Sequence, residues 1–534
     1  KLMFYINRFF SNISKKFKVF YLNSNFYDKK ISKVNNNDFF YKPSPYLLSS
    51  LIKYQKKKVK IDDFLFEDVW LKNNVSRKEL KKLNGFYWLF SLDLKSSKKI
   101  TRSIISNWIE INKKYNSKTW DFDLTAKRII AWLSSYNLTF EDSDENYKKK
   151  FNMMIQKQTN HLINEINKTK VYDDKLIGCA AIILVGLCYK FDKNHLTNAL
   201  NILKKISRVS LDNTGFPKTR NIKQLTFYLK YFILIREWFK EAQITVPENV
   251  EETIYYLGQG YSFIWQNVNT DLFFNGNSNS NNQEFDNYLK RLGYKFKNDN
   301  QDFGGYIICR DKKTCLALDA GSTPNSKFTE NYQSGALSFE IIRNQKKLIS
   351  NCGYFRENDK LNQISKSSAT HNTLVIDDHS SSYINNSSMI HRGLKILKKK
   401  IIFEKNYWKV ELAHDGYLKK YDSIHERIIE YYPEQMAFTG TDKIIKKKKN
   451  KNFKFDIRFH VEPNIRLMKT QDNKTILIEL DNEGWKFSCD NFDINIDNGL
   501  YFGKKNSYTS NQNIFISEIS YNQIENIKWY IKKI

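Results

Sequence analysis

The chain has few cysteines and no metal-binding cysteine motif, and this shortage removes two classes of protein. Its 534 residues contain six cysteines, which form neither a CxxC pair nor a dense framework. This pattern excludes a zinc ribbon and a scaffold held together by disulfides. Cys309 and Cys315 are close enough in sequence to face each other across a hairpin, but small buried residues in adjacent strands are the favoured interpretation.

Long apolar runs are also missing. The best candidate covers residues 176–189, whereas a membrane span requires about 18 to 20 apolar residues. This run therefore predicts a buried core helix, and no transmembrane segment is predicted. The basic, aromatic N-terminal segment lacks an apolar core followed by a small-residue cleavage site, so no signal peptide is recognised. Packing against the first domain is its predicted role, and peripheral contact with a membrane surface is the alternative.

Acidic residues are outnumbered, and the formal net charge is +30. Such a charge favours a polyanionic partner, namely an acidic glycan, nucleic acid or an anionic membrane surface. The lysines are spread over the whole chain, however, so a solvated surface explains most of the charge. Runs such as residues 446–449 lack interleaved aromatic residues, and no RNA-binding or helix-turn-helix motif is present. No nucleic-acid partner is predicted.

The hydrophobic pattern changes its period near residue 275, and the length of the chain favours two large domains. Between residues 62 and 261, apolar residues recur at spacings of three and four, which indicates stacked helical hairpins. Ile104, Trp108, Ile111 and Tyr115 are one example. The Gly/Ser/Asn-rich residues 275–282 predict a linker that buries nothing, and residues 284–294 predict a short helix.

The C-terminal half shows β-rich segments of four to eight residues between hairpin turns. Ten or more such strands predict a large antiparallel β-sandwich. The later predicted strands cover residues 408–413, 424–432, 453–461, 475–480, 485–490 and 514–519.

A series of short sequence blocks in this half has a recognisable order. Eight of them follow one another within about 170 residues: LDAG from 318, LSFE from 337, LISNCG from 348, ATHNTLVIDD from 369, HDGY from 414, IHER from 424, IRFHVEP from 457 and EGWKF from 483. In this order they resemble the C-terminal domain of heparinase II/III-like proteins, a family of bacterial polysaccharide lyases and their relatives.

The helical half adds to this resemblance. Trp120, Arg128 and Trp132 are similar to a tryptophan–arginine–tryptophan pattern of the family, and the loop ending in TRN at residues 219–221 is similar to the loop after its long apolar helix. The resemblance implies an N-terminal (α/α) toroid of helical hairpins followed by a C-terminal antiparallel β-sandwich. The predicted domains are residues 1–60 packing on the toroid, 61–274 as the toroid, 275–300 as linker and short helix, and 301–534 as the sandwich.

The chemistry implied by the resemblance is β-elimination of a uronate-containing polysaccharide in a cleft between toroid and sandwich. A polar or cationic group neutralises the uronate carboxylate, a base takes the α-proton, and an acid protonates the leaving oxygen. The family's Asn-His pair falls on Asp174 and Lys175, and its histidines before LSFE fall on Asn331 and Gln333. Its tyrosine falls near Ile222, so Tyr228 or Tyr231 is the expected substitute.

These positions give the predicted site. The predicted catalytic residues are Lys175, Tyr228, Asn331 and His371, and the predicted substrate-binding residues are Asp174, Arg128, Arg220, Asn221 and Gln333. No cofactor is predicted, and zinc held by Cys352 and His371 is the weaker alternative. A hydrogen-bonded histidine at the domain interface is the other interpretation of His371. His414 and His425 are predicted to stabilise turns and strands, and His161 and His195 to lie on the surface.

Two functions remain open. The first is a polysaccharide lyase acting on a glycosaminoglycan-like or alginate-like acidic polysaccharide. The second is a glycan-binding protein with impaired catalysis that serves assembly or export of bacterial surface polysaccharide. The resemblance places the chain in the cell envelope or periplasm, and the missing signal peptide makes the cytoplasm the alternative. The substrate and the oligomeric state stay undetermined.

Overall fold

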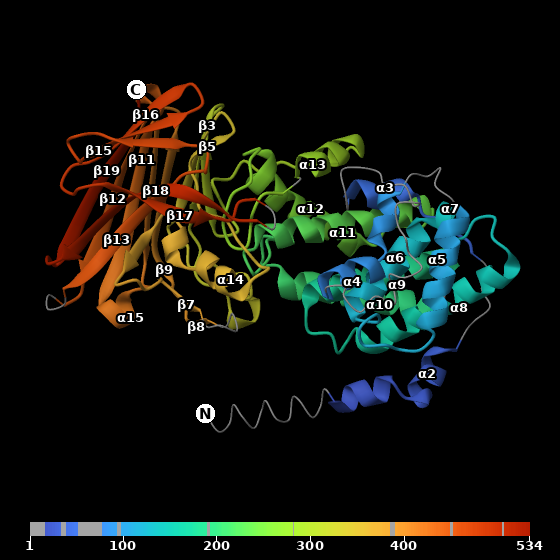
Figure 1. Ribbon diagram of the computed structural model, residues 1–534. Helices are drawn as coiled ribbons and strands as arrows, with labels where there is room; N and C mark the ends of the chain where they lie inside the picture. Colours follow the sequence, from blue (N-terminus) through green and yellow to red (C-terminus); the bar gives the residue numbers. More distant parts are fainter. Residues whose placement is uncertain are drawn as a thin grey trace. The chain divides into compact units, whose positions relative to one another are not determined.

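The computed structural model describes residues 16–33, 39–51, 77–92, 98–189, 193–280, 282–384, 390–448, 452–504 and 507–534. Parts of the predicted N-terminal segment, at residues 1–15, 34–38 and 52–60, lie outside this set. Figure 1 shows the helices in blue to green and the sheets in yellow to red.

The chain forms two compact units. The helical unit contains residues 1–209 and 227–254, and the sheet unit contains residues 210–226 and 255–534. The limits between the units, at residues 209/210, 226/227 and 254/255, each fall within a helix. The predicted domain boundaries at residues 61, 275 and 301 stay predictions.

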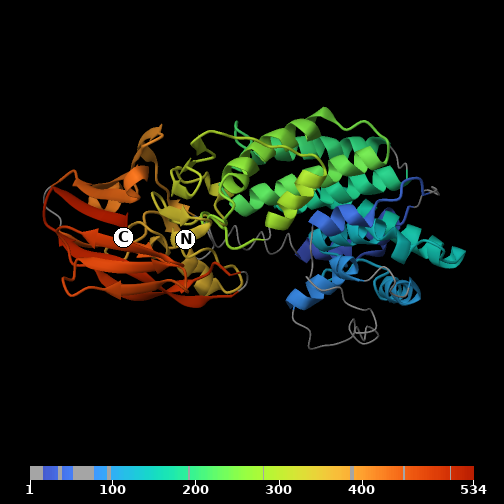
Figure 2. The same ribbon diagram turned by 90° about the horizontal axis from the view of Figure 1, so that it is seen from above.

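The helical unit is built from helices, which Figure 2 shows from above. Its elements are α2 (Asn25–Ile31), α3 (Pro45–Leu51), α4 (Arg77–Asn84), η2 (Tyr87–Ser91), α5 (Lys98–Ile111), α6 (Phe122–Ser134), α7 (Tyr136–Thr139), α8 (Glu145–Glu165), α9 (Tyr172–Tyr189), α10 (Lys193–Ser210), α11 (Ile222–Glu241) and α12 (Glu248–Tyr261).

Local sequence explains these helices. The Asp144 carboxylate caps α8 by accepting a hydrogen bond from the Tyr147 backbone N–H. Helix α9 is apolar nearly all round, as expected for a helix buried on every side, and it packs against α6 and α8. The described part of the N-terminal segment contacts the same unit, because the Phe40 N–H donates to the Cys188 carbonyl at 2.7 Å. None of the described helices combines the length and apolar character needed to cross a membrane.

The sheet unit contains strands together with several helical elements, some of which lie between the strands. Its helical elements are η3 (Ser262–Gln266), α13 (Asn282–Arg291), η4 (Ser326–Phe328), α14 (Asp359–Ser365), η5 (Ser368–Thr370), α15 (Leu418–Tyr421) and η6 (Pro433–Gln435). Its strands are β1 (Asp302–Phe303), β2 (Tyr306–Arg310), β3 (Thr314–Asp319), β4 (Phe339–Arg343), β5 (Lys346–Ile349), β6 (Leu374–Ile376), β7 (Tyr383–Ile384), β8 (Ile390–Arg392), β9 (Ile396–Glu404), β10 (Tyr407–His414), β11 (Ser423–Tyr432), β12 (Ala437–Lys446), β13 (Phe453–His460), β14 (Arg466–Lys469), β15 (Thr475–Leu480), β16 (Glu483–Cys489), β17 (Asn495–Tyr501), β18 (Thr509–Ser520) and β19 (Ile524–Lys533).

These strands pair antiparallel in sheets. Eight of them form one sheet in the order β14-β15-β16-β19-β12-β11-β10-β9, five form β1-β2-β3-β4-β5, and four form β17-β18-β13-β6. Strand β11 alternates buried and half-buried residues along its whole length, which is the period of a strand with one face in the core. Register is therefore fixed, because a slip by one residue would move the apolar side chains to the other face.

The core of the sheet unit lies between these sheets. Phe339 of β4 stacks on Trp529 of β19 with ring centroids 5.3 Å apart, and Phe459 of β13 meets the same indole at 5.1 Å. One tryptophan thus joins a strand from each of the three large sheets. The predicted fold class, an (α/α) toroid of helical hairpins followed by an antiparallel β-sandwich, is confirmed.

Candidate functional site

Arg220 lies in the sheet unit at the turn before α11, and its side chain is buried. Its guanidinium forms an ion pair with Asp319 and donates to the carbonyls of Gly321 at 3.0 Å and Gly305 at 2.9 Å. Burial opposes its charge, but the Asp319 carboxylate raises the net pKa of Arg220 above its usual range. Arg220 was predicted to bind substrate. That role stays a prediction, and in the structure most of the Arg220 donors bond protein oxygens.

The segment predicted to be a linker with nothing to bury is buried in the sheet unit. Asn275 is 1% exposed, and its amide donates to the Tyr306 hydroxyl at 2.9 Å and to the Asp319 carboxylate at 3.1 Å. Gly276 adopts φ +83° and donates its N–H to the Gln333 side-chain oxygen at 2.9 Å. This prediction was wrong, because polar composition indicates a loop but does not reveal which partners satisfy its amides.

Gln333 joins three loops of the sheet unit. Its side-chain oxygen accepts from Gly276, and its amide donates to the carbonyls of Gly353 at 3.1 Å and Ser365 at 2.5 Å. Gln333 has no exposed surface. Its observed role is therefore to hold loops together, and its predicted contact with substrate stays untested.

His371 is also buried, at 1% exposure. Its Nδ1 lies 2.8 Å from the Ser367 carbonyl, which can only accept, so Nδ1 carries the proton and Nε2 is an acceptor. Nε2 has no hydrogen-bond partner among the described residues. Burial lowers the pKa of His371 to about 4. A histidine of this kind is neutral near pH 7.

The weaker zinc alternative does not fit these residues. Burial raises the pKa of Cys352 to about 12, which disfavours the thiolate that zinc binds. Its Sγ lies 3.9 Å from the Asn511 amide. In the described part of the chain, no three His, Cys, Asp or Glu side chains gather as a metal ion requires.

Asn331 belongs to a polar group, which we call the Asn331 cluster and define as Asn331, Tyr354, Asn362 and Lys366. Asn331 and Asn362 are half-buried, and Tyr354 and Lys366 are buried. The Tyr354 hydroxyl donates to the Asn331 side-chain oxygen at 2.9 Å, and the Asn362 amide donates to that hydroxyl at 3.1 Å. The Lys366 ammonium donates to the carbonyl of Glu330, the residue before Asn331, at 2.7 Å.

Burial shifts the pKa values of two groups in this cluster in opposite directions, so that one can act as an acid and the other as a base. Burial raises the pKa of Tyr354, so its phenol stays protonated. Burial also lowers the pKa of Lys366 to about 8, so part of its amine is neutral near physiological pH. The neighbouring pair of Glu330 and Arg356, 3.1 Å apart, is largely solvent-exposed. The sequence prediction included Asn331 but missed Tyr354 and Lys366, because neither has a motif of its own.

Asn221 lies beside this cluster in the sheet unit. Its side-chain oxygen accepts from the Gln224 backbone N–H at 3.1 Å and caps α11. A Cβ at Gly276 would lie 2.6 Å from the Asn221 amide nitrogen and 3.0 Å from the Asn331 Cβ. Glycine at position 276 thus lets the two asparagines approach one backbone. Of the predicted site residues, the structure brings Asn221, Asn331 and Gln333 together around Gly276.

Arg128 lies inside the helical unit with no exposed surface. Its guanidinium donates to the Gln158 side chain at 3.0 Å and to the carbonyls of Asn84 at 2.9 Å and Thr119 at 3.0 Å. It also covers the Trp108 ring at 3.9 Å. Its donors point to protein groups in a buried site, and its predicted role in substrate binding stays a prediction.

The other predicted residues of the helical unit lie in different surroundings. Asp174 and Lys175 are half-buried in the first turn of α9. Burial raises the pKa of Asp174 to about 6, and the nearby Asp123 carboxylate adds to this shift. The Lys175 ammonium lies 5.6 Å from the centroid of the Tyr172 ring. Tyr228 in α11 has no exposed surface, and its predicted catalytic role stays a prediction.

Two predictions about histidines have different outcomes. His161 was expected on the surface, but it is 2% exposed and its Nδ1 lies 2.8 Å from the Tyr27 hydroxyl. Polar neighbours in sequence hid its position on the inner face of α8. His425 in β11 contacts Asp442 at 2.7 Å, and His414 accepts from the Gly416 N–H at 3.0 Å. The prediction that these two stabilise strands and turns is confirmed.

Comparison with known proteins agrees with this architecture. Residues 300–530 match the family model described as Heparinase II/III-like, C-terminal. A crystal structure of heparinase III is similar with a TM-score of 0.70 at 14% identity, over 94% of this chain and 88% of that one. Heparan sulfate lyase HepC from Pedobacter heparinus gives a TM-score of 0.65 at 12% identity, over 95% and 87%. At such identities the likeness shows the fold alone, and comparison with the curated proteins finds no match.

Proposed function

Since residues 300–530 form a heparinase II/III-like C-terminal domain, we propose that the chain binds an acidic, uronate-containing polysaccharide and cleaves it by β-elimination. The observation that carries this proposal is the Asn331 cluster, where a protonated phenol lies 2.9 Å from the Asn331 amide and a lysine of lowered pKa donates to the carbonyl of the preceding residue, Glu330. Amide, acid and base are the three kinds of group that the reaction needs.

In the proposed reaction, the Asn331 and Asn221 amides donate hydrogen bonds to the uronate carboxylate and make its α-proton more acidic. The neutral Lys366 amine takes that proton. The electron pair forms the new carbon–carbon double bond and expels the glycosidic oxygen from the β-carbon. The Tyr354 hydroxyl then gives its proton to the leaving oxygen, and the products are an unsaturated uronate and a free hydroxyl.

The test is turnover of heparin-type, alginate and chondroitin-type polysaccharides, followed by the ultraviolet absorbance of the unsaturated product. Lys366→Met and Tyr354→Phe are each expected to lower kcat by roughly 10²- to 10⁴-fold, the usual contribution of an acid or base. The matched controls are Lys360→Met in α14, the helix that ends just before Lys366, and Tyr508→Phe at an exposed site. Wild-type kcat should rise as the pH increases through about 8, because Lys366 must lose its proton first. Unchanged turnover in both cluster variants contradicts these roles.

A second function is favoured by a specific observation. Asn331 and Gln333 stand where the resemblance places histidines, and neither side chain can exchange a proton near pH 7. The second proposal is therefore a glycan-binding protein without turnover that serves assembly of a surface polysaccharide in the cell envelope. Salt-sensitive binding of an acidic polysaccharide without any unsaturated product supports it, and the appearance of that product in wild type but not in Lys366→Met rules it out.

A further inference from the structure

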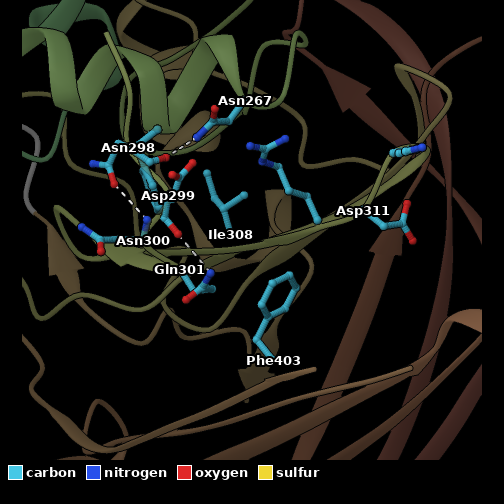
Figure 3. Close-up of a pocket in the computed structure, with 11 residues that line it drawn as sticks. Asn267, Asn298, Asp299, Asn300, Gln301, Ile308, Asp311 and Phe403 are labelled. Carbon is cyan, nitrogen blue, oxygen red and sulfur yellow. Dashed lines mark hydrogen bonds between the residues drawn. The ribbon is translucent and has the colours of Figure 1, made fainter. Parts of the chain in front are cut away.

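A second candidate binding site lies in the sheet unit, in a cavity of about 450 Å³. It is lined by η3 and the turn after it, the loop at residues 298–301, β2 with its hairpin turn, and Phe403 of β9 (Figure 3). Ligand pockets typically have volumes of about 300–1,000 Å³. The cavity therefore has the size of a small-ligand site.

Side-chain amides give this cavity its polar lining. The Asn267 amide donates to the Asn298 carbonyl at 2.6 Å, and the Asn298 side-chain oxygen accepts from the Asn300 N–H at 3.0 Å. The Gln301 amide donates to the Asp299 carbonyl at 3.1 Å. Figure 3 shows Asn298, Asn300 and Gln301 on one side of the cavity, opposite Asp311. These bonds fix the loop and leave the Asn267 and Gln301 side-chain oxygens for hydroxyl donors of a ligand.

The lining carries two acids, Asp299 and Asp311, and two cations, Arg310 and Lys312, which differ in their partners. The Asp299 carboxylate is paired with Lys297 at 2.7 Å, and the Asp311 carboxylate accepts from the N–H groups of Lys313 and Thr314, both at 2.7 Å. Arg310 and Lys312 also line the cavity and are exposed, and neither forms an ion pair among the described residues. The acids are therefore engaged, whereas the cations are available. A planar guanidinium suits a carboxylate or a sulfate.

An aromatic ring completes the lining. Phe403 is 38% exposed, and its ring rests against Trp408 with centroids 5.4 Å apart. Phe263, which is 1% exposed, forms an apolar part of the wall. A partly exposed ring with fixed orientation offers apolar contact area at low entropic cost, and the C–H face of a sugar ring is apolar.

We propose that this cavity is a non-catalytic binding site for an acidic oligosaccharide. The Arg310 guanidinium binds a carboxylate or sulfate of the ligand, the amides bind its hydroxyls, and Phe403 packs against one sugar face. The inference rests on the proposed function only for the class of ligand. It assigns a second point of attachment, separate from the residues of the Asn331 cluster, at which a long chain is held between turnovers.

The test uses hydrogen exchange of the full chain with hexasaccharides of polymannuronate, heparin and chondroitin sulfate, and with cellohexaose as a neutral probe. At least one acidic probe should slow exchange in peptides covering residues 297–312, and cellohexaose should not. Arg310→Ala should weaken this protection about tenfold in apparent Kd, the effect of losing one charged contact, and Phe403→Leu should weaken it severalfold. Lys313→Ala removes a cation of the same hairpin that does not line the cavity, and should leave Kd within about twofold.

The outcomes separate this inference from the proposed function. Peptides covering residues 329–366 report the Asn331 cluster. Protection there without protection at residues 297–312 overturns the second site and leaves the proposed function standing. Protection at residues 297–312 in a protein that forms no unsaturated product supports the second site and counts against the lyase. Equal weakening by Arg310→Ala and Lys313→Ala overturns the second site, because it shows a general charge effect.

Discussion

Arg128 in the helical unit and Arg427 in the sheet unit are both buried, but they are satisfied in different ways. Arg128 donates to an amide and to backbone carbonyls, all of them neutral. Arg427 binds both oxygens of Asp442, at 2.7 and 3.0 Å, and also donates to the Leu337 carbonyl at 2.8 Å.

Because the two arginines have different partners, the stability of each unit depends on different groups. Burial opposes ionisation of Asp442, but Arg427 and His425 lower its pKa below the usual range. The same carboxylate accepts from the Trp529 indole at 2.9 Å, so the ion pair is tied to the tryptophan at the centre of the core. In the helical unit, burial lowers the pKa of Arg128, and none of the carboxylates that the structure describes forms an ion pair with it. The buried Arg427 charge depends on the single carboxylate of Asp442. The hydrogen bonds of Arg128 are instead divided among several neutral acceptors.

The largest expected effect is that of Asp442→Asn. The change leaves the Arg427 charge buried without its partner, so we expect a loss of about 3–5 kcal/mol in the free energy of unfolding, measured by urea denaturation. Asp481→Asn is the control, because Asp481 and Lys346 form an exposed pair at 3.3 Å that is worth under about 1 kcal/mol. If Asp442→Asn lowers the free energy of unfolding no more than Asp481→Asn does, the stability of the sheet unit does not depend on the Arg427–Asp442 ion pair.

Arg128→Met is expected to cost less, about 2–3 kcal/mol. The variant leaves the Asn84 and Thr119 carbonyls without a donor, but no buried charge remains unpaired. Urea denaturation followed by tryptophan fluorescence measures it. Arg128→Lys keeps the charge and should fall between wild type and Arg128→Met. If Arg128→Met costs as much as Asp442→Asn, neutral acceptors are not the more tolerant arrangement.

The smallest effect, when measured over one pH unit, is the pH dependence of stability that comes from the buried histidines. Burial lowers the pKa of both His161 and His371 to about 4, below the value of about 6.5 in the unfolded chain. Their contribution to stability is therefore complete above pH 6.5 and is lost as the pH falls from there towards 4. Each histidine should give about 1.4 kcal/mol per pH unit in that window.

His161→Gln in the helical unit and His371→Gln in the sheet unit should each reduce this slope in urea denaturation between pH 4 and 6.5. The half-exposed His195 provides the control variant, His195→Gln. Reduction in only one unit would show that the two buried histidines are not equivalent.

Much of the fold was accessible from the pattern of residues. The predicted strand at residues 475–480 is β15, and the predicted helix at 284–294 overlaps α13. Strand β9 was missed, because its lysines and largely exposed face interrupt the alternation that marks a strand. The candidate site was accessible only in part. Asn331 was placed through the family resemblance, but Tyr354 and Lys366 acquire their pKa shifts from burial that no local pattern encodes.

The sequence by itself determined the order of helices and strands, the switch between the two periods and the excess of positive charge, because these depend on residues that are close along the chain. The tertiary structure alone decided which polar groups are available. Arg220 pairs with Asp319 across 99 positions, and Asn275 bonds Asp319 across 44. A side chain is a ligand group or a structural one according to what surrounds it, and those surroundings are assembled only when distant segments pack together.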